Sequence, residues 1–252
     1  MSTPRFYCPD LHAGELTLSE AESRHALQSL RLRPGDELEL FDGQGHVARG
    51  VLQPPPPADE RRKVSRQARA VVQAIHDVEQ PSHALTLIVA GCKGSRLDWL
   101  VEKCTELGVG RLLLTEFERS VVHTRDRHVT KLTRTTIEAC KQCGRSWLPE
   151  IVAGAKLPDV LRQRGDAPLV YAHLGDNTPS LTKYLTGVKE LPDDLGVVVG
   201  PEGGLSANEV ELLAKVGQPV RLARHVLRIE TAAIAAAATW AAHACRYDSP
   251  TS

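Results

Sequence analysis

The sequence predicts an α/β protein with a mainly parallel sheet, preceded by a small β-barrel-like domain. From about residue 84, wholly apolar segments of strand length alternate with segments whose apolar residues recur at helical spacing. This alternation is typical of a parallel sheet covered by helices on both faces. Before residue 77, short segments alternate apolar and polar residues between turn signals, which indicates half-buried strands. We therefore expect domains over residues 1–76 and 77–252.

The first domain is expected to contain strands joined by tight turns. Three segments follow the strand pattern: Glu15–Leu18, Asp36–Asp42 and His46–Gln53. Between the first two, Ser19 is a good helix N-cap and Glu22 follows three residues later, so a short helix is expected over Ser19–Leu30. The four prolines at 54–57 mark a loop or strand break, because proline cannot donate to a sheet ladder.

In the second domain, apolar strands and amphipathic helices alternate. The expected strands are Ala84–Ala90, Arg111–Phe117, Pro168–Leu174, Leu195–Gly200 and Pro219–Leu222. A helix is expected over Leu97–Leu107, closed by Gly108, and another over Lys131–Gly144. Ser206 with Glu209 forms a capping-box pattern that starts a third helix, and an alanine-rich helix ends the chain.

Composition narrows the function class. Lysine plus arginine and aspartate plus glutamate number 31 each, which argues against a strongly basic nucleic-acid binder but allows a local basic face. No apolar run approaches a membrane span, and the N-terminal residues lack the pattern of a signal peptide. Six scattered cysteines fit a reduced setting. We therefore expect a cytoplasmic protein with no membrane partner.

The only closely spaced cysteines are Cys140 and Cys143, a CxxC pair inside a helical pattern. No second pair and no cluster of histidines accompanies them, and a zinc or redox site needs more ligands than two. Buried free cysteine is common in helix packing. We expect ordinary packing here and no metal.

Two basic runs stand out in the neutral chain. One lies between Arg61 and Arg69, and the other between Arg119 and Arg145. Either run alone is usually a solvated surface. Two of them together favour a polyanionic partner somewhat more strongly.

A glycine-rich loop follows the strand at Leu195–Gly200. Its sequence, Gly200-Pro201-Glu202-Gly203-Gly204, has neither the GxGxxG spacing of a dinucleotide site nor the Lys-Ser/Thr of a phosphate loop. Glycines let a backbone approach a ligand closely and leave N–H groups free to bind it. A tight strand-to-helix turn would use the same residues, so the loop alone leaves both interpretations open.

A second polar loop, from His225 to Thr231, follows the next short strand. Leu227 and Ile229 supply apolar surface, while Arg228 and Glu230 supply charge beside it. An adenosine-like ligand needs this mixture of apolar slot and polar groups. Because ligands bind at the carboxyl edge of open α/β sheets, the two loops together predict a ligand site. The alternative is helix capping, since an acidic residue favours a helix start.

These motifs resemble those of a known family. The segments VVVGPEGGLSANEV and LRIETA are similar to the C-terminal signature of the SPOUT methyltransferases, and the pair is characteristic of the bacterial 16S rRNA uridine-N3 methyltransferases. KGSRLDWLVEKCTELGV, with Glu138, Gln142 and Arg145, matches the same family. In the first domain His25, Leu30-Arg31, Gly35-Asp36 and residues 41–45 resemble its PUA-like RNA-binding domain. The sequence departs from the family at Cys140, Lys141 and Ala223.

The resemblance implies a trefoil-knot domain that binds S-adenosyl-L-methionine. The residues that it assigns to the cofactor are Leu174, Gly175, Val199, Gly200, Pro201, Glu202, Gly203, Gly204, Leu205, Leu222, Ala223, Val226 and Leu227. It also implies a homodimer with the closing helix in the interface. The implied substrate is 16S rRNA in the assembled small ribosomal subunit.

The implied chemistry sets its own requirement on the residues. Uridine N3 is protonated at neutral pH and must lose its proton to attack a sulfonium methyl group, which needs a base or donors that stabilise the anion. We expect Arg228 to stabilise the anion, and Glu230 or Glu202 to accept the proton or hold Arg228. Holding both reactants within attack distance accounts for much of the acceleration, and no metal is required.

The RNA contacts are expected to come from basic residues in both domains, because phosphate contacts position a protein on its RNA. The candidates are Arg5, Arg31, Arg33, Lys93, Arg119 and Arg145. Two rival functions remain open. One is another SPOUT target, such as the ribose 2′-oxygen of tRNA, and the other is a non-catalytic RNA-binding protein of ribosome assembly.

Overall fold

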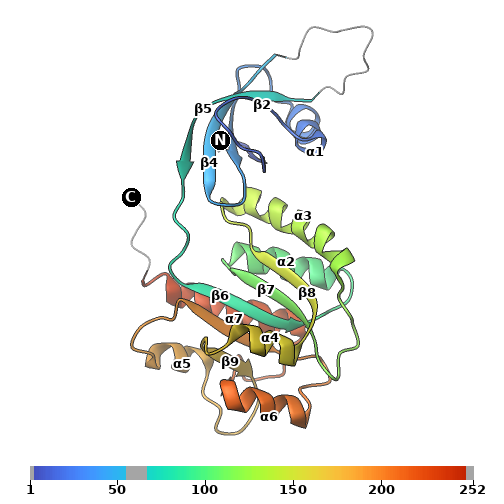
Figure 1. Ribbon diagram of the computed structural model, residues 1–252, viewed down its shortest axis with the longest axis vertical. Coiled ribbons are helices and arrows are strands. Elements are labelled where there is room, and N and C mark those ends of the chain that lie inside the picture. The colour runs from blue at the N-terminus through green and yellow to red at the C-terminus, as the bar shows by residue number, and fades with distance from the viewer. Residues whose placement is uncertain (1–2, 55–66, 248–252) are drawn as a thin grey trace. The chain divides into compact units, whose positions relative to one another are not determined.

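The computed structural model describes residues 3–54 and 67–247, and these fall into two compact units (Figure 1). The first unit runs to Gln80 and also takes in Cys140–Leu148, while the second holds Pro81–Ala139 and the chain from Pro149 on. Part of the proline loop and most of the first basic run lie outside the described residues: 55–57, Arg61, Arg62, Lys63 and Arg66. The side chain of Arg127 lies outside them as well.

The first unit contains a five-stranded sheet in the order β1-β3-β4-β5-β2. The strands are β1 (Arg5–Tyr7), β2 (Gly14–Thr17), β3 (Glu37–Phe41), β4 (His46–Leu52) and β5 (Arg69–Asp77). β1 runs parallel to β3, and the other neighbouring pairs are antiparallel. The three strands predicted in this region are present. β1 and β5 were not predicted, because β1 has only three residues and the second half of β5 is exposed.

The helix predicted over Ser19–Leu30 is present in two forms. α1 (Glu20–Arg24) leads into η1 (His25–Ser29), a short π-helix. The N-cap is confirmed, since the Ser19 hydroxyl accepts a hydrogen bond from the Glu22 amide at 3.2 Å. The cap satisfies one of the amides that a helix start otherwise leaves unpaired.

A segment from much later in the chain completes the first unit, which the expected division after residue 76 did not include. Trp147 packs on the turn between β3 and β4, where a Cβ on Gly45 would lie 2.2 Å from the indole ring. Gly45 also has a φ of 95°, a conformation that only glycine adopts at little cost. The indole nitrogen donates to the Val78 carbonyl at 3.0 Å. The turn therefore requires glycine for both conformation and space.

Arg5 is part of this packing, which corrects its assignment as an RNA contact. Its Nη1 donates to the carbonyls of Cys140 and Arg145, and its Nη2 donates to the Ser146 hydroxyl at 2.7 Å. Its Nε lies 2.8 Å from a Glu39 oxygen, and the side chain is only 7% exposed. The sequence does not show that this arginine is buried, because the carbonyl and hydroxyl groups that it binds belong to a segment about 140 residues away.

The second unit contains a six-stranded sheet in the order β11-β9-β10-β6-β7-β8, and every neighbouring pair is parallel. The strands are β6 (Ala84–Ala90), β7 (Arg111–Glu116), β8 (Glu150–Lys156), β9 (Leu169–Ala172), β10 (Asp194–Val199) and β11 (Gln218–Val220). The predicted α/β class with a mainly parallel sheet is confirmed. β8 was not predicted, because its residues are half-buried or exposed and it lacks the apolar run of its neighbours.

Helices pack on this sheet. They are α2 (Ser95–Glu106), α3 (Asp126–Cys143), α4 (Leu157–Arg164), α5 (Leu181–Gly187), α6 (Ala207–Val216) and α7 (Ile229–Ala244). The capping box predicted at Ser206 and Glu209 is present in full. α7 contacts β6 and α2 (Figure 1), and its small residues Ala233, Ala236 and Ala237 are fully buried there. No helix among the described residues is long and apolar enough to cross a membrane.

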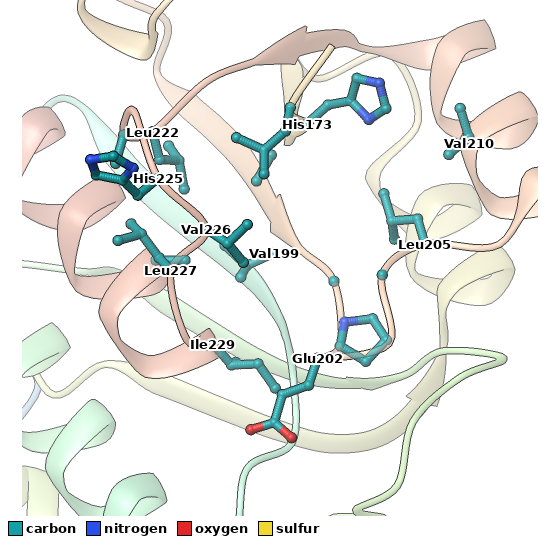
Figure 2. A pocket seen from close by; sticks show the side chains of 17 residues that line it. His173, Val199, Glu202, Leu205, Val210, Leu222, His225, Val226, Leu227 and Ile229 are labelled. Atoms are coloured by element: carbon teal, nitrogen blue, oxygen red, sulfur yellow. The ribbon is translucent and has the colours of Figure 1, made fainter.

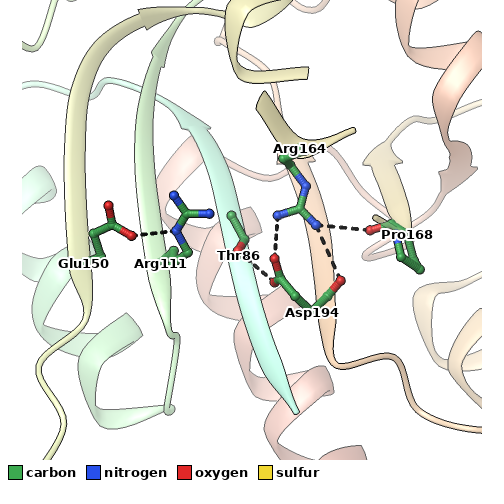
Figure 3. A network of polar contacts seen from close by, with 6 residues as sticks. All are labelled: Thr86, Arg111, Glu150, Arg164, Pro168 and Asp194. Atoms are coloured by element: carbon green, nitrogen blue, oxygen red, sulfur yellow. Dashed lines mark hydrogen bonds and ion pairs between the residues drawn. The ribbon is translucent and has the colours of Figure 1, made fainter. Parts of the chain in front are cut away.

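A polar network joins the starts of several strands in the second unit (Figure 3). Asp194, the first residue of β10, accepts hydrogen bonds from the Thr86 hydroxyl and from Nη1 of Arg164, both at 2.8 Å. The Arg164 side chain is 4% exposed. Arg111 and Glu150 pair on β7 and β8 at 2.7 Å, in a more exposed place. The Asp194 network thus fixes β10 at the end opposite to the loop that begins at Gly200.

Candidate active site

A cavity of about 410 Å³ opens at the carboxyl ends of β9, β10 and β11 (Figure 2). Three loops, one residue of α6 and the start of α7 line it: 172–174, 199–202 with 204–205, 222–223 with 225–227, Val210, and Ile229 with Ala232. This is the edge of a parallel sheet where ligands usually bind. The two motif loops that sequence analysis singled out therefore lie on the same cavity.

Most of the residues assigned to the cofactor line this cavity, and two do not. Gly175 and Gly203 are absent from its wall. A Cβ on Gly175 would lie 2.9 Å from the Thr178 hydroxyl, and one on Gly203 would lie 3.4 Å from the Arg119 Cβ, so both glycines face protein atoms. Sequence analysis did not name five further lining residues as contacts: Ala172, His173, Val210, His225 and Ala232. His225 belongs to the loop that it identified, and Ile229, expected to supply apolar surface there, also lines the cavity.

The cavity wall is mainly apolar. Val199, Leu222 and Leu227 point toward it, and Leu205 lies across from them (Figure 2). At its rim, Leu174 is 53% exposed and Val226 is 81% exposed. Large apolar side chains this exposed commonly mark a binding surface. An apolar slot beside free backbone groups suits a ligand with a flat ring.

The 200–205 loop is held in a compact shape by its own residues. The Gly204 amide donates to the Pro201 carbonyl at 2.8 Å, and Gly204 has a φ of 72°, which favours glycine. A Cβ on Gly200 would lie 2.8 Å from Cδ2 of Leu205. Behind the loop, Glu209 accepts from the amides of Ser206 and Glu118, both at 2.8 Å. This wall of the cavity is therefore preformed.

Arg119 also holds this loop, although it was expected to contact RNA. Its Nη1 donates to the Gly203 carbonyl at 3.1 Å and to the Leu205 carbonyl at 3.4 Å. Arg119 follows β7, so it ties the loop after one strand to the loop after another. A role in binding RNA stays a prediction. In the structure the guanidinium is hydrogen-bonded to the loop of its own chain.

Replacing Arg119 by alanine is expected to weaken binding of S-adenosylmethionine modestly. Two hydrogen bonds from a charged donor to the loop would be lost, at an exposed site where water can replace them. We expect the dissociation constant measured by calorimetry to rise about three- to tenfold, or roughly 0.6–1.4 kcal/mol. Arg119→Lys should recover part of the loss. An unchanged constant for Arg119→Ala would show that the loop keeps its shape without this residue.

The three expected catalytic residues belong to neighbouring segments, but only one of them, Glu202, lines the cavity. Glu202 lines the cavity and is largely exposed, whereas Glu230 lies in the first turn of α7 with its side chain 7% exposed. Arg228 is the exposed N-cap residue of α7 and does not line the cavity. Within the described part of the chain, the cation that pairs with these carboxylates is Arg96, not Arg228.

Sequence analysis did not identify Arg96 as a site residue. Its Nη1 lies 3.3 Å from Oε1 of Glu202 and 3.8 Å from Oε1 of Glu230. Arg96 lies in the first turn of α2, which follows β6, so its place at the same sheet edge was a usable signal. The segment KGSRLDWL matches the family motif, but the match assigns no role to Arg96.

Cys92 lies beside the same charges. Burial, and next the charge of Glu230, raise the pKa of its thiol to about 11. The thiol is therefore protonated at neutral pH, and a protonated thiol is a poor nucleophile. Cys92 is 3% exposed and packs in the core of the second unit. We assign it no chemical step.

The remaining RNA candidates differ in exposure. Arg31, Arg33 and Lys93 are exposed, and Arg31 has a φ of 55°, an uncommon backbone conformation for a side chain of this size. Arg145 is half-buried, and burial lowers the pKa of its guanidinium. The contacts of these four residues with RNA stay predictions.

Comparison with known proteins identifies the relatives of both units. Residues 78–241 match the family described as an RNA methyltransferase domain, and residues 18–57 match an RNA methyltransferase PUA domain. Ribosomal RNA small subunit methyltransferase E of a Synechocystis species is 30% identical over 222 residues, covering 86% of this chain and 69% of the relative. The Bacillus subtilis protein of that name is 27% identical and covers 87% of each.

The fold also has solved counterparts. Ribosomal RNA small subunit methyltransferase E from Neisseria gonorrhoeae, solved bound to S-adenosyl methionine, superposes with a TM-score of 0.79. The two sequences are 28% identical, and the match covers 94% of this chain and 96% of that one. The likeness extends over nearly the whole length of both proteins, so it includes the cavity and the first unit.

Proposed function

This chain belongs to the RNA methyltransferase family, and on that premise we propose that it methylates N3 of a uridine in 16S ribosomal RNA with S-adenosyl-L-methionine as donor. The observation that carries the proposal is the cavity, because the loops bearing both family motifs line it. Its 410 Å³ volume lies within the range of roughly 300–1,000 Å³ found for small-molecule sites.

The residues present fit the donor. Gly200 and Gly204 bring backbone close to the cavity, and Leu205, Leu222 and Leu227 give an apolar slot for a flat ring. Leu174 and Val226 would cover a ligand at the rim, where they are now exposed. We keep Gly175 and Gly203 as residues that shape the loops rather than contacts, since both face protein atoms.

S-adenosylmethionine supplies a methyl group on a positively charged sulfur, so the chain must supply a deprotonated uridine N3. We assign the proton to Glu202, because it lines the cavity while the carboxylate of Glu230 is buried. The N3–H bond then gives its electron pair to the new N–CH3 bond, and the methyl–sulfur pair stays on sulfur. Arg228, exposed at the start of α7, is available to stabilise negative charge on the uracil carbonyls.

The RNA substrate calls for positive charge outside the cavity. We propose that Arg31, Arg33 and Lys93, all exposed, bind phosphates, since such contacts position a protein on RNA without reading its sequence. The small ribosomal subunit is the proposed form of the substrate, and a ribosomal substrate places the protein in the cytoplasm.

We also propose a homodimer. One face of α7 carries Ile234, Ala235, Ala238 and Ala242, which are half-buried or exposed. Ala235, Ala238 and Ala242 are small residues at helical spacing and allow a second helix to approach closely, so this face suits a second copy of the chain. The opposite face of α7 is packed in the core of the second unit.

The deciding experiment is transfer of labelled methyl from S-adenosylmethionine to small ribosomal subunits that lack the modification. We expect N3-methyluridine in 16S rRNA when the product nucleosides are separated. Methyl on ribose or in tRNA would keep the enzyme class and overturn the substrate. Cofactor binding without transfer to any of these RNAs would favour the assembly-protein alternative.

A further inference from the structure

Arg96 lies between two carboxylates that come from different parts of the fold. Glu202 belongs to the loop after β10, and Glu230 belongs to the first turn of α7. The same nitrogen of Arg96, Nη1, lies 3.3 Å from Glu202 Oε1 and 3.8 Å from Glu230 Oε1. One guanidinium therefore joins a wall of the cavity to the helix that forms another wall.

The local backbone places Arg96 there. β6 ends at Ala90, and α2 begins at Ser95 after Gly94, whose φ of 60° with a ψ of −135° is a conformation reserved for glycine. Among the residues that the structure describes, no side chain caps the start of α2. The chain thus turns abruptly from strand to helix, and the first helical turn carries Arg96 to the carboxyl edge of the sheet. α2 packs against α7, which brings Glu230 within reach.

Glu230 explains why the contact matters. Its side chain is 7% exposed, and its Oε2 has no hydrogen-bond partner among the described residues. A buried carboxylate without a counter-charge is strongly unfavourable. The start of α7 supplies some compensation through its free amides, and Arg96 supplies the paired charge. An ordinary surface ion pair would lack such a buried partner and contribute little.

We propose that Arg96 is a positioning residue, which holds Glu202 and Glu230 together so that the 200–205 loop and the start of α7 keep one fixed geometry around the cavity. Its consequence for methyl transfer rests on the proposed function, but its consequence for cofactor binding does not need an RNA substrate. The planar fork of arginine suits two carboxylates, whereas the single ammonium of lysine serves them less well.

The test compares Arg96→Gln and Arg96→Lys with the wild-type protein in calorimetric binding of S-adenosylmethionine and in single-turnover methyl transfer. For Arg96→Gln we expect binding weakened about tenfold and a further fall in the rate at saturating donor, because the proton acceptor is no longer held in place. Arg96→Lys should recover part of both. Lys103→Gln is the matched control, since Lys103 lies on the same helix and its partners among the described residues are Glu102 and Glu106, away from the cavity.

A double-mutant cycle separates positioning from general damage to the fold. Glu202→Gln removes one partner on an exposed loop, so this variant should fold normally. If Arg96 acts through Glu202, adding Arg96→Gln to the Glu202→Gln variant should weaken cofactor binding by clearly less than the roughly tenfold expected when Arg96→Gln is made in the wild-type protein. Additive effects on binding would overturn the proposal, as would wild-type binding by Arg96→Gln. If Arg96→Gln does not fold, Arg96→Lys completes the same cycle.

The two proposals fail in different ways. If the wild-type protein binds the donor but leaves 16S rRNA unmethylated, the proposed function fails. The cycle measured by calorimetry then still decides the role of Arg96. If methylation occurs and the cycle is additive, only the role of Arg96 is lost.

Discussion

Replacing Gly200 by valine is expected to weaken binding of S-adenosylmethionine about 100-fold, which corresponds to about 2.7 kcal/mol. A Cβ at Gly200 would lie 2.8 Å from Cδ2 and 3.0 Å from Cγ of Leu205, and valine adds two methyl groups to that overlap. Leu205 must move, and both residues line the cavity.

Gly187→Val is the control for this substitution. Gly187 ends α5 in the same unit, and a Cβ there would meet no atom of the described chain within 4 Å. We expect unchanged cofactor binding for this variant. Thermal unfolding should be near normal for both variants, because the Gly200 loop is outside the buried sheet. Wild-type affinity in Gly200→Val would show that the donor does not occupy this cavity.

The second large effect is on stability, at Asp194. Replacing it by alanine leaves the Arg164 guanidinium, whose side chain is 4% exposed, without its counter-charge, and it also removes the acceptor of the Thr86 hydroxyl. Breaking a buried pair costs about 3–5 kcal/mol, and the 31% exposure of Asp194 reduces this. We expect the free energy of unfolding, from denaturant titration, to fall by about 2–3 kcal/mol.

Glu150→Ala provides the comparison within the same sheet. Its pair with Arg111 is 41% and 56% exposed, and such pairs contribute about 0–1 kcal/mol. Cofactor affinity of the folded Asp194→Ala variant should stay close to wild type, because Asp194 lies at the opposite end of β10 from Gly200. A stability loss for Asp194→Ala no larger than that for Glu150→Ala would mean that water solvates Arg164 adequately.

Much of the second unit could be predicted from the sequence, because its strands are buried on both faces. Leu195–Gly200 is a continuous apolar run and Ala84–Ala90 is apolar apart from Thr86, and the structure places strands there with bounds within one residue of those predicted. β8 at Glu150–Lys156 escaped notice, since half-buried strands carry a mixed pattern. The start of α3 at Asp126 is five residues earlier than predicted, because its first turns lack apolar periodicity.

The candidate site, too, was predictable only in part. The motif loops could be placed on a common sheet edge, since parallel strands end there, and 11 of the 13 residues assigned to the cofactor line the cavity. Partners across the fold could not be predicted. Arg96 meets Glu202 and Glu230 only after β6, β10 and α7 are assembled. Arg5 and Arg119 look like surface cations in the sequence, and both bind carbonyls that are distant along the chain.

The order of the strands in the second unit bears on how the protein folds as it is synthesised. β6 pairs with β10, where Ala84 lies opposite Asp194, so the central partner arrives 110 residues after the strand that needs it. Until then β6 presents an unpaired apolar edge, which is a template for association between chains. Sheets built from such distant pairings fold slowly. A growing chain that already contains β6, β7 and β8 is therefore exposed to aggregation until residue 199 leaves the ribosome and β10 closes the sheet.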